Sequence, residues 1–246
     1  MSFPCSRAAF CAILSVLLTA SAASAAVDDS VPTTLSVTQI LAQMQYHNKS
    51  QAEELKHYQA VRHYQAEYQG FSTSIVGNME VAVSFDAALG KSFRIVSQNG
   101  SKILCEKVLK RAVDSEREAQ QDNATTALTP ANYRFQLLGT EYLNGRPAYI
   151  MNVAPLKDSK FLYRGKIWVD AADFAVAKIE AEPAKSPSFW ISRTLIHYTS
   201  AKTGNFWLPQ QSRSETKVRI GGNATLTIDY GTYQTVPNSP PRGAGN

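Results

Sequence analysis

Apolar and polar residues alternate with a period of two through most of the chain between residues 60 and 236, and this limits the possible folds more than any other feature. The clearest case is YRGKIWVDAADFAVAKIE, from Tyr163 to Glu180, in which two alternating runs flank an Asp-Ala-Ala-Asp corner. Such alternation predicts half-buried strands, and a short polar corner between two of them predicts a hairpin. The chain is therefore expected to be mainly β.

The alternation in this hairpin assigns side chains to two faces, because successive residues of a strand point in opposite directions. The expected apolar face consists of Phe161, Tyr163, Ile167, Val169, Ala175, Ala177 and Ile179. The expected polar face consists of Arg164, Lys166, Trp168, Asp170, Lys178 and Glu180. The apolar face could belong to an ordinary sandwich core or form one wall of a cavity.

Other segments show the same alternation and are bounded by turn residues, so we expect about ten antiparallel strands. Asn99-Gly100 predicts the end of a strand, and Asn144-Gly145 predicts a tight hairpin turn. The remaining expected strands are residues 60–71, 78–87, 91–100, 132–142, 146–155, 189–200, 206–218 and 224–236.

Two segments have helical spacing instead. The first helix is expected from Val37 to about Tyr58, with Ser36 and Gln39 forming a capping box. The second is expected over residues 101–121, with Ser101 as its N-cap. Each has one apolar stripe, and one face of a curved antiparallel sheet is the natural place to bury both stripes.

The first 25 residues have the features of a cleaved secretory signal peptide. Arg7 supplies a positive charge, Ala8 to Ala20 form a short apolar run, and Ala23-Ser24-Ala25 is a small-residue cleavage site. The apolar run is shorter than the ~20 residues of a membrane span, so an uncleaved anchor is the lesser alternative. We therefore expect export, with no integral membrane segment.

The rest of the chain divides into a short lead-in, one large domain and a tail. The lead-in is residues 26–34, the domain is residues 35–236, and residues 237–246 form a Pro- and Gly-rich tail that is expected to be disordered. After cleavage only Cys105 remains of the three cysteines, so no intramolecular disulfide is expected and Cys105 should be buried as a small hydrophobe.

Several classes of function lack support in the sequence. The formal net charge of +5 is spread along the chain without a run of four basic residues, which argues against nucleic-acid binding. No Gly-x-Ser-x-Gly motif is present, and no two histidines stand four apart with a glutamate between them. Asp170 and Asp173 are interpreted as turn residues. We expect no enzyme activity, no catalytic residues, no metal and no cofactor.

Aromatic residues crowd the last hundred positions, and they leave two architectures open. In a sandwich they would form the core, whereas in an open barrel they would line a ligand cavity. Residue types alone favour the sandwich core. The residues concerned include Tyr149, Tyr163, Trp168, Phe189, Trp190, Tyr198, Phe206, Trp207, Tyr230 and Tyr233.

Three motifs in this region resemble the LolA-like superfamily of bacterial periplasmic lipoprotein-sorting proteins, which also includes RseB-type envelope-stress regulators. They are GKIWVDAADFAVAKIE with Trp168-Val169-Asp170, NFWLPQQS with Trp207-Leu208-Pro209, and ATLTIDYGTY with Ile228-Asp229-Tyr230. The sharp motifs lie between Leu162 and Tyr233, although the order of elements agrees over most of the chain after residue 35.

The resemblance implies a mainly β fold with two helical insertions, in which helices cover the concave face of an open, half-closed antiparallel β-barrel of about ten strands. It also implies a soluble monomer of the periplasm that carries or binds lipoprotein acyl chains or other lipids. The alternative is an RseB-like regulator that binds a polypeptide partner of the bacterial envelope. No equivalent of the carrier's lid-locking arginine is evident, with Arg94 and Arg134 as candidates.

The expected cavity lining follows from alternation within each expected strand. A register slip of one residue would turn any of these side chains to the opposite face. The candidate ligand-binding residues are Tyr64, Tyr68, Val81, Val83, Phe93, Ile95, Phe135, Tyr149, Met151, Ile167, Val169, Ile179, Ile196, Tyr198, Leu226 and Ile228.

Overall fold

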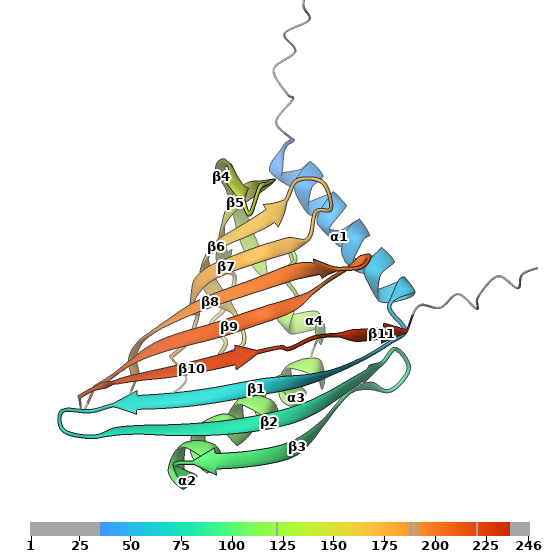
Figure 1. The fold of residues 1–246 in the computed structure, drawn as a ribbon. Helices are drawn as coiled ribbons and strands as arrows, with labels where there is room; N and C mark the ends of the chain where they lie inside the picture. The colour runs from blue at the N-terminus through green and yellow to red at the C-terminus, as the bar shows by residue number, and fades with distance from the viewer. Residues whose placement is uncertain (1–34, 122, 187–188, 190, 220, 237–246) are drawn as a thin grey trace, which may run out of the picture. The chain divides into compact units, whose positions relative to one another are not determined.

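One antiparallel sheet organises the computed structural model, which describes residues 35–121, 123–186, 189, 191–219 and 221–236. Ten strands are hydrogen-bonded in the order β3-β2-β1-β10-β9-β8-β7-β6-β5-β4, and the short strand β11 pairs with β1. The sheet curves, and within these residues no ladder joins β3 to β4, so it remains open (Figure 1). The expected open, mainly β fold is therefore confirmed, whereas a sandwich of two sheets is not formed.

The strands agree with the sequence segments that alternate with a period of two, except that the expected strand 224–236 is divided into β10 and β11. The described residues therefore contain eleven strands instead of about ten. Their bounds are β1 His57–Gln69, β2 Ser74–Asp86, β3 Gly90–Gly100, β4 Tyr133–Leu143, β5 Arg146–Pro155, β6 Tyr163–Asp170, β7 Val176–Pro183, β8 Ile191–Thr203, β9 Phe206–Val218, β10 Asn223–Asp229 and β11 Gln234–Val236.

Helix α1 spans Val37–Glu54 and begins with the expected capping box of Ser36 and Gln39. It ends earlier than the expected Tyr58, because Tyr58 belongs to β1, where it pairs with Phe85 of β2. A strand cannot continue a helical hydrogen-bond pattern, so the change in conformation between Glu54 and His57 ends the helix.

The second helical region is continuous in sequence but changes its winding. It consists of α2 (Lys102–Leu104), a π-helical turn η1 (Cys105–Leu109) and α3 (Lys110–Gln121), followed by the short α4 (Asn123–Thr126). Ser101 caps its start, as expected. Cys105 is buried, and its thiol contacts the carbonyl oxygens of Asn78 and Asn99.

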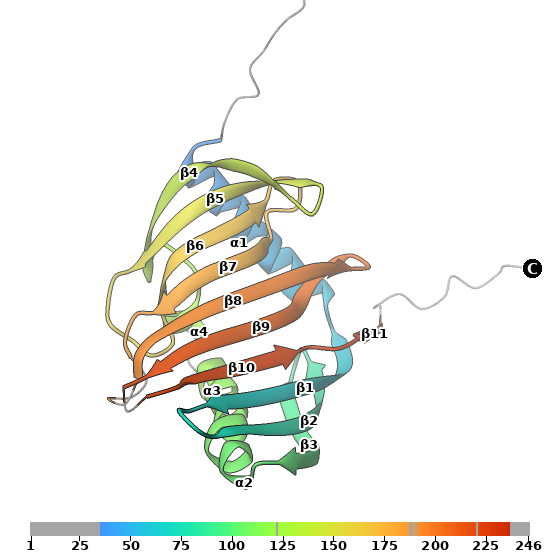
Figure 2. The ribbon, with the colours of Figure 1, turned by 60° about the vertical axis from the view of Figure 1, so that its left-hand side comes forward.

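Both helical regions lie on the same, inner face of the sheet (Figures 1 and 2). Residues Leu104, Leu109 and Val113 pack on β1, β2 and the neighbouring part of the sheet in one apolar cluster. Ile40 and Met44 of α1 pack on β4, β5 and β6 in a second cluster. The core is thus divided between the two ends of the sheet, and the strands between them receive less cover.

The hairpin of β6 and β7 forms as expected, but one face was assigned wrongly. A bulge between Trp168 and Val169 places Val176, not Ala177, opposite Val169. Val176 consequently packs in the second cluster. Trp168 lies on the outer face yet is buried, because Glu141 accepts a hydrogen bond from its indole and Lys178 covers its ring.

Two other expectations can be compared with the structure. Asn144 and Gly145 both have positive φ angles in the β4–β5 turn, as a tight hairpin requires. Among the described residues, no helix is long and apolar enough to cross a membrane. The expected signal peptide, the lead-in and the expected disordered tail lie outside the described residues.

We predict that Leu109→Ala lowers the free energy of unfolding by about 2–5 kcal/mol, because Leu109 is completely buried between the helical region and the sheet. Chemical denaturation of the purified protein measures this change. Ile103→Ala is the matched control, since Ile103 lies in the same helical region but is 68% exposed. Its expected effect is within about 0.5 kcal/mol. Equal effects of the two substitutions would contradict the packing described.

Candidate functional site

A row of directly paired residues crosses the inner face from β1 to β4 and identifies which central side chains point inward. Residues that pair across antiparallel strands share one face. Tyr64 lies in the first cluster and Ile167 in the second, so the residues paired between them must also face inward. The row is Tyr64, Ile228, Ser212, Tyr198, Ile179, Ile167, Met151 and Leu137.

A neighbouring row places small side chains at the same central point. Leu226 pairs with Ser214, and Ser214 pairs with Ile196. Ser214 and the adjacent Ser212 stand on β9, midway between the two apolar clusters. Serines project little into the interior, whereas Ile196 and Leu226 beside them offer apolar surface. The centre of the inner face therefore has apolar walls around a floor of small residues.

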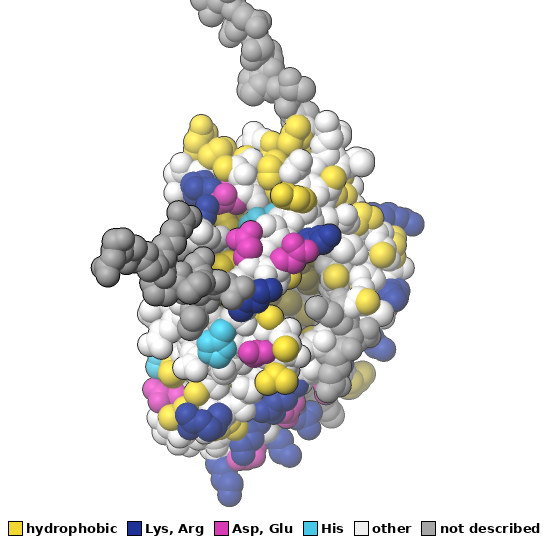
Figure 3. Space-filling view, turned by 90° about the vertical axis from the view of Figure 1, so that its right-hand side faces the viewer, with side chains coloured by type: hydrophobic (Ala, Val, Ile, Leu, Met, Phe, Trp, Pro, Cys, Tyr) yellow, Lys and Arg dark blue, Asp and Glu magenta, His cyan; other side chains and the backbone are white. Residues whose placement is uncertain are grey.

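The central side chains are not completely covered by the helices. Ile196, Tyr198, Leu226 and Ile228 are all half-buried, in contrast to the fully buried Ile167 and its neighbours in the second cluster. In the space-filling view of Figure 3, hydrophobic side chains are visible at the bottom of a hollow. The two clusters thus leave accessible apolar surface between them.

Tyr163 and Tyr198 are strongly desolvated but keep some accessible surface. Burial raises the pKa of both phenols, because the surrounding protein disfavours the phenolate. Both side chains nevertheless keep accessible surface. Each phenol is thus only partly covered by neighbouring side chains. Nearby phenols add to the pKa shift, Tyr133 for Tyr163 and Tyr230 for Tyr198.

The sixteen candidate residues from the sequence fall into four groups. Ile95 is 38% exposed on the edge strand β3, and Ile196 and Tyr198 lie at the centre of the inner face. The first cluster holds Tyr64, Tyr68, Val81, Val83, Phe93, Leu226 and Ile228. The second holds Phe135, Tyr149, Met151, Ile167, Val169 and Ile179.

Arg62 also faces inward and is absent from the sequence-based list. It is completely buried on β1, and its Nη1 lies 2.7 Å from Glu116 of α3. Lys91 of β3 lies 3.1 Å from the same carboxylate. Burial opposes the charge of Arg62, but Glu116 outweighs it and the pKa of Arg62 is raised. Alternation alone could have found Arg62, because it stands two residues before Tyr64 in the same strand.

Neither candidate for a lid-locking arginine contacts a helix through a described bond. Arg94 and Arg134 are exposed side chains on β3 and β4. Arg62 joins the inner face of the sheet to α3 through Glu116, and Arg117 of α3 donates a hydrogen bond to the Phe93 carbonyl of β3. It also lies over the rings of Tyr230 and Phe93, with its Cζ 4.6 Å and 5.7 Å from their centroids.

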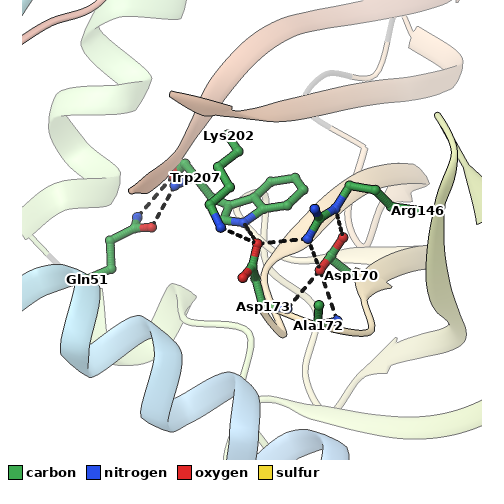
Figure 4. A network of polar contacts seen from close by, with 7 residues as sticks. All are labelled: Gln51, Arg146, Asp170, Ala172, Asp173, Lys202 and Trp207. Carbon is green, nitrogen blue, oxygen red and sulfur yellow. Dashed lines mark hydrogen bonds and ion pairs between the residues drawn. The ribbon is translucent and has the colours of Figure 1, made fainter. Parts of the chain in front are cut away.

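A second polar network ties α1 to the sheet (Figure 4). The Gln51 side chain donates a hydrogen bond to the Trp207 carbonyl at 3.0 Å and accepts one from the Trp207 amide at 2.9 Å. The Trp207 indole donates to Asp173 at 2.9 Å, and Lys202 lies 2.9 Å from the same carboxylate. The C-terminal half of α1 is thereby fixed to the start of β9.

Asp170 is the fixed point of this network at the β6–β7 corner. Arg146 binds it through two atoms, with Nε 2.5 Å and Nη2 2.8 Å from its two oxygens (Figure 4). The amides of Ala172 and Asp173 donate to Oδ1. The turn interpretation of Asp170 is confirmed. Burial acts to raise the pKa of Asp170, but Arg146 and the two amides outweigh it, so this pKa is lowered.

Two depressions lined mainly by outward-facing residues do not belong to the apolar interior. The larger is a groove of about 740 Å³ beside β1, β2 and β3, with His63, Arg94 and Asp229 among its lining residues. The other, of about 240 Å³, lies beside Lys178 and Trp207. Polar and charged groups make up about half of the lining of the groove, whereas the smaller depression is mainly apolar and is bordered by Arg146, Asp170, Lys178 and Lys202. Within the described residues no group of three potential metal ligands occurs.

Comparisons with known proteins give structural matches only. No protein-family model matches the sequence, and no curated protein matches it. A LolA superfamily protein from Nitrosomonas europaea is similar at 11% identity and a TM-score of 0.38, over 84% of this chain and 96% of that one. A DUF1329 family protein from Desulfovibrio piger is similar at 10% identity and a TM-score of 0.40, over 83% of this chain and 95% of that one.

The lipoprotein LppX from Mycobacterium tuberculosis is also similar, at 12% identity and a TM-score of 0.25, over 79% of this chain and 95% of that one. The protein from Nitrosomonas europaea is a member of the superfamily that the sequence motifs resemble. At these identities and TM-scores the likeness carries no function over to this chain.

We predict that Asp170→Asn destabilises the protein at neutral pH by about 1–3 kcal/mol, because the charged bonds to Arg146 weaken. The pKa of Asp170 is lowered in the fold from 3.8, so its contribution is complete above that value and is lost as pH falls through the lowered pKa. Unfolding curves measured from neutral to acidic pH should therefore converge for the variant and the wild type at low pH. Parallel curves would contradict this role.

Proposed function

We propose that this protein binds acyl chains of a lipid or of a lipidated polypeptide on the inner face of its sheet, between α1 and α3. The observation that carries the proposal is the half-buried apolar centre of that face, where Ile196, Tyr198 and Ile228 surround the small residues of β9. Apolar side chains left accessible inside a fold have no structural partner. A hydrocarbon guest would supply one.

The physical driving force for such binding is the transfer of hydrocarbon out of water. Each methylene shielded by the inner face stabilises the complex by about 0.8 kcal/mol. A chain of many methylenes can thus bind firmly without polar contacts along its length. The lining phenols and serines can meet polar atoms of the guest, whereas nothing in the proposal requires a reaction, and we propose a binder and not an enzyme.

The place of action proposed here is the bacterial periplasm, with the protein as a soluble monomeric carrier or binder. The signal-peptide features of residues 1–25 support export. A carrier keeps its guest shielded from water during passage between membranes, and helices that cover one face of an open sheet suit that task. The polar network around Gln51 and Trp207 would keep α1 in place over the guest.

We predict that Ser212→Trp weakens binding of a fluorescent fatty acid at least about tenfold, because the indole would occupy space at the centre of the inner face. Fluorescence titration measures the affinity. Gln211→Trp is the matched control, since Gln211 is the neighbouring residue and is exposed on the outer face. Circular dichroism and melting curves establish that both variants are folded. Wild-type affinity in a folded Ser212→Trp protein would refute binding at this place.

Native mass spectrometry of the protein purified from its host envelope tests what it carries. Co-purified mass of an acyl compound is the expected result. A stoichiometric polypeptide in place of a lipid would instead favour the RseB-like alternative, in which the same domain docks on an envelope protein. Because the measurement needs no variant, it does not depend on the fate of any substitution.

A further inference from the structure

The guanidinium of Arg62 uses only one of its nitrogen atoms in a described hydrogen bond. Nη1 donates to Glu116 of α3 at 2.7 Å. Nε and Nη2 are buried and make no hydrogen bond of normal geometry among the described residues, and the same holds for the buried hydroxyl of Tyr64, which lies close enough to the guanidinium to interact with it electrostatically. Buried polar groups in folded proteins almost always have partners, so three unpartnered ones on adjacent inward positions of β1 require an explanation.

The two unpartnered nitrogens form the side of the guanidinium that binds planar acids. Nε–H and Nη2–H point in parallel and match the two oxygens of a carboxylate or phosphate. This protein uses the same pair of atoms elsewhere, since Nε and Nη2 of Arg146 bind the two oxygens of Asp170. The unpartnered edge of Arg62 is therefore a group of known recognition chemistry.

The charges around Arg62 favour an acid over a neutral group. Arg62 and Lys91 share the single carboxylate of Glu116. Arg117, a further charged side chain, lies over the Phe93 ring and is paired with Asp114 at the surface. The cluster of Arg62, Lys91 and Glu116 consequently has more positive than negative charge, and an anion at the unpartnered edge would balance it.

Arg62 also borders the apolar space. Arg62 stands two residues from Tyr64 on the same face of β1, and Tyr64 pairs with Ile228 at the centre of the inner face. The Cζ atom of Arg62 also lies 4.6 Å from the ring centroid of Tyr230. The unpartnered nitrogens are covered in this structure. An acid would reach them when the covering rings of Phe93 or Tyr230 shift, while α3 stays in place and Glu116 keeps its bond to Nη1.

We infer that the ligand is an acidic lipid, whose carboxylate or phosphate headgroup is bound by the Nε and Nη2 atoms of Arg62 and by the Tyr64 hydroxyl while its hydrocarbon chain lies along the centre of the inner face. This inference rests on the proposed function and narrows it to a substrate class. It gives the interior a polar end at β1 and an apolar end toward β8.

The test compares ligands that share a chain and differ in headgroup. Affinities for hexadecyl phosphate, palmitate and hexadecanol are measured by displacement of a fluorescent acyl probe from the wild-type protein, in alkaline buffer in which both acids are ionised. Inorganic phosphate and acetate serve as headgroups without a chain. We expect both acids to bind at least about tenfold more tightly than hexadecanol, and the chainless anions not to displace the probe.

Each contrary result has a distinct meaning. Equal affinity for hexadecanol and the two acids would overturn the headgroup site and would indicate that water is the hydrogen-bond partner of Arg62. It would leave the proposal of acyl binding intact. Displacement by inorganic phosphate alone would overturn the lipid assignment in favour of a site for free anions. If no long-chain ligand displaces the probe, the proposed function itself fails.

Two substitutions test whether Arg62 and the Tyr64 hydroxyl cause the preference for acids over the alcohol. Arg62→Lys keeps the charge but removes the paired donors, and Tyr64→Phe removes only the hydroxyl; each should reduce the preference for acid over alcohol severalfold. Arg94→Gln is the control, because Arg94 is an exposed cation on the neighbouring strand β3. If Arg62→Lys does not fold, Tyr64→Phe and the wild-type headgroup series still decide. An unchanged preference in folded Tyr64→Phe would remove Tyr64 from the site.

Discussion

The imbalance between a wide apolar sheet face and a small number of covering helices is the constraint on which this structure depends. Ten strands present their inward side chains to the interior, whereas among the described residues only α1 and the region from α2 to α3 are long enough to cover them. The helices pack at opposite ends, on β1 to β3 and on β4 to β6. The strands between them keep accessible apolar surface, and this surface supports the proposal of an acyl guest.

Polar side chains fix each helical region to the sheet, and they do so in different ways. Glu116 of α3 pairs with the buried Arg62, an arrangement that is costly to desolvate and strongly destabilising when one partner is lost. Gln51 of α1 forms neutral hydrogen bonds to the backbone of Trp207, which leads through Asp173 to the Arg146–Asp170 pair. One helix is thus held by a buried ion pair and the other by a network at the surface.

Local patterns predicted most of the fold, because they reflect rules that act within a few residues. Alternation located the strands, Ser36 with Gln39 located the start of α1, and Asn144-Gly145 located a turn. The bulge between Trp168 and Val169 and the end of α1 at Glu54 both depend on strand pairing, which short sequence patterns do not contain. For this reason Ala177 was placed opposite Val169 and Tyr58 was placed in the helix. Arg62 follows the alternation of β1, but it was not among the expected inward residues, because a charged residue is rarely expected on an inner face.

Because β3 and β4 are free edge strands of an open sheet, the width of the interior is not fixed by closure. A closed barrel has a girth fixed by its strand number and stagger. Here the sheet ends at β3 and at β4, and no described hydrogen bonds join these two edge strands. The curvature of the sheet can therefore change without the loss of hydrogen bonds between strands. Under the proposed function, an interior of this kind would accommodate guests of unequal bulk by a change in its width, and it would discriminate chain length or branching less sharply than a closed barrel.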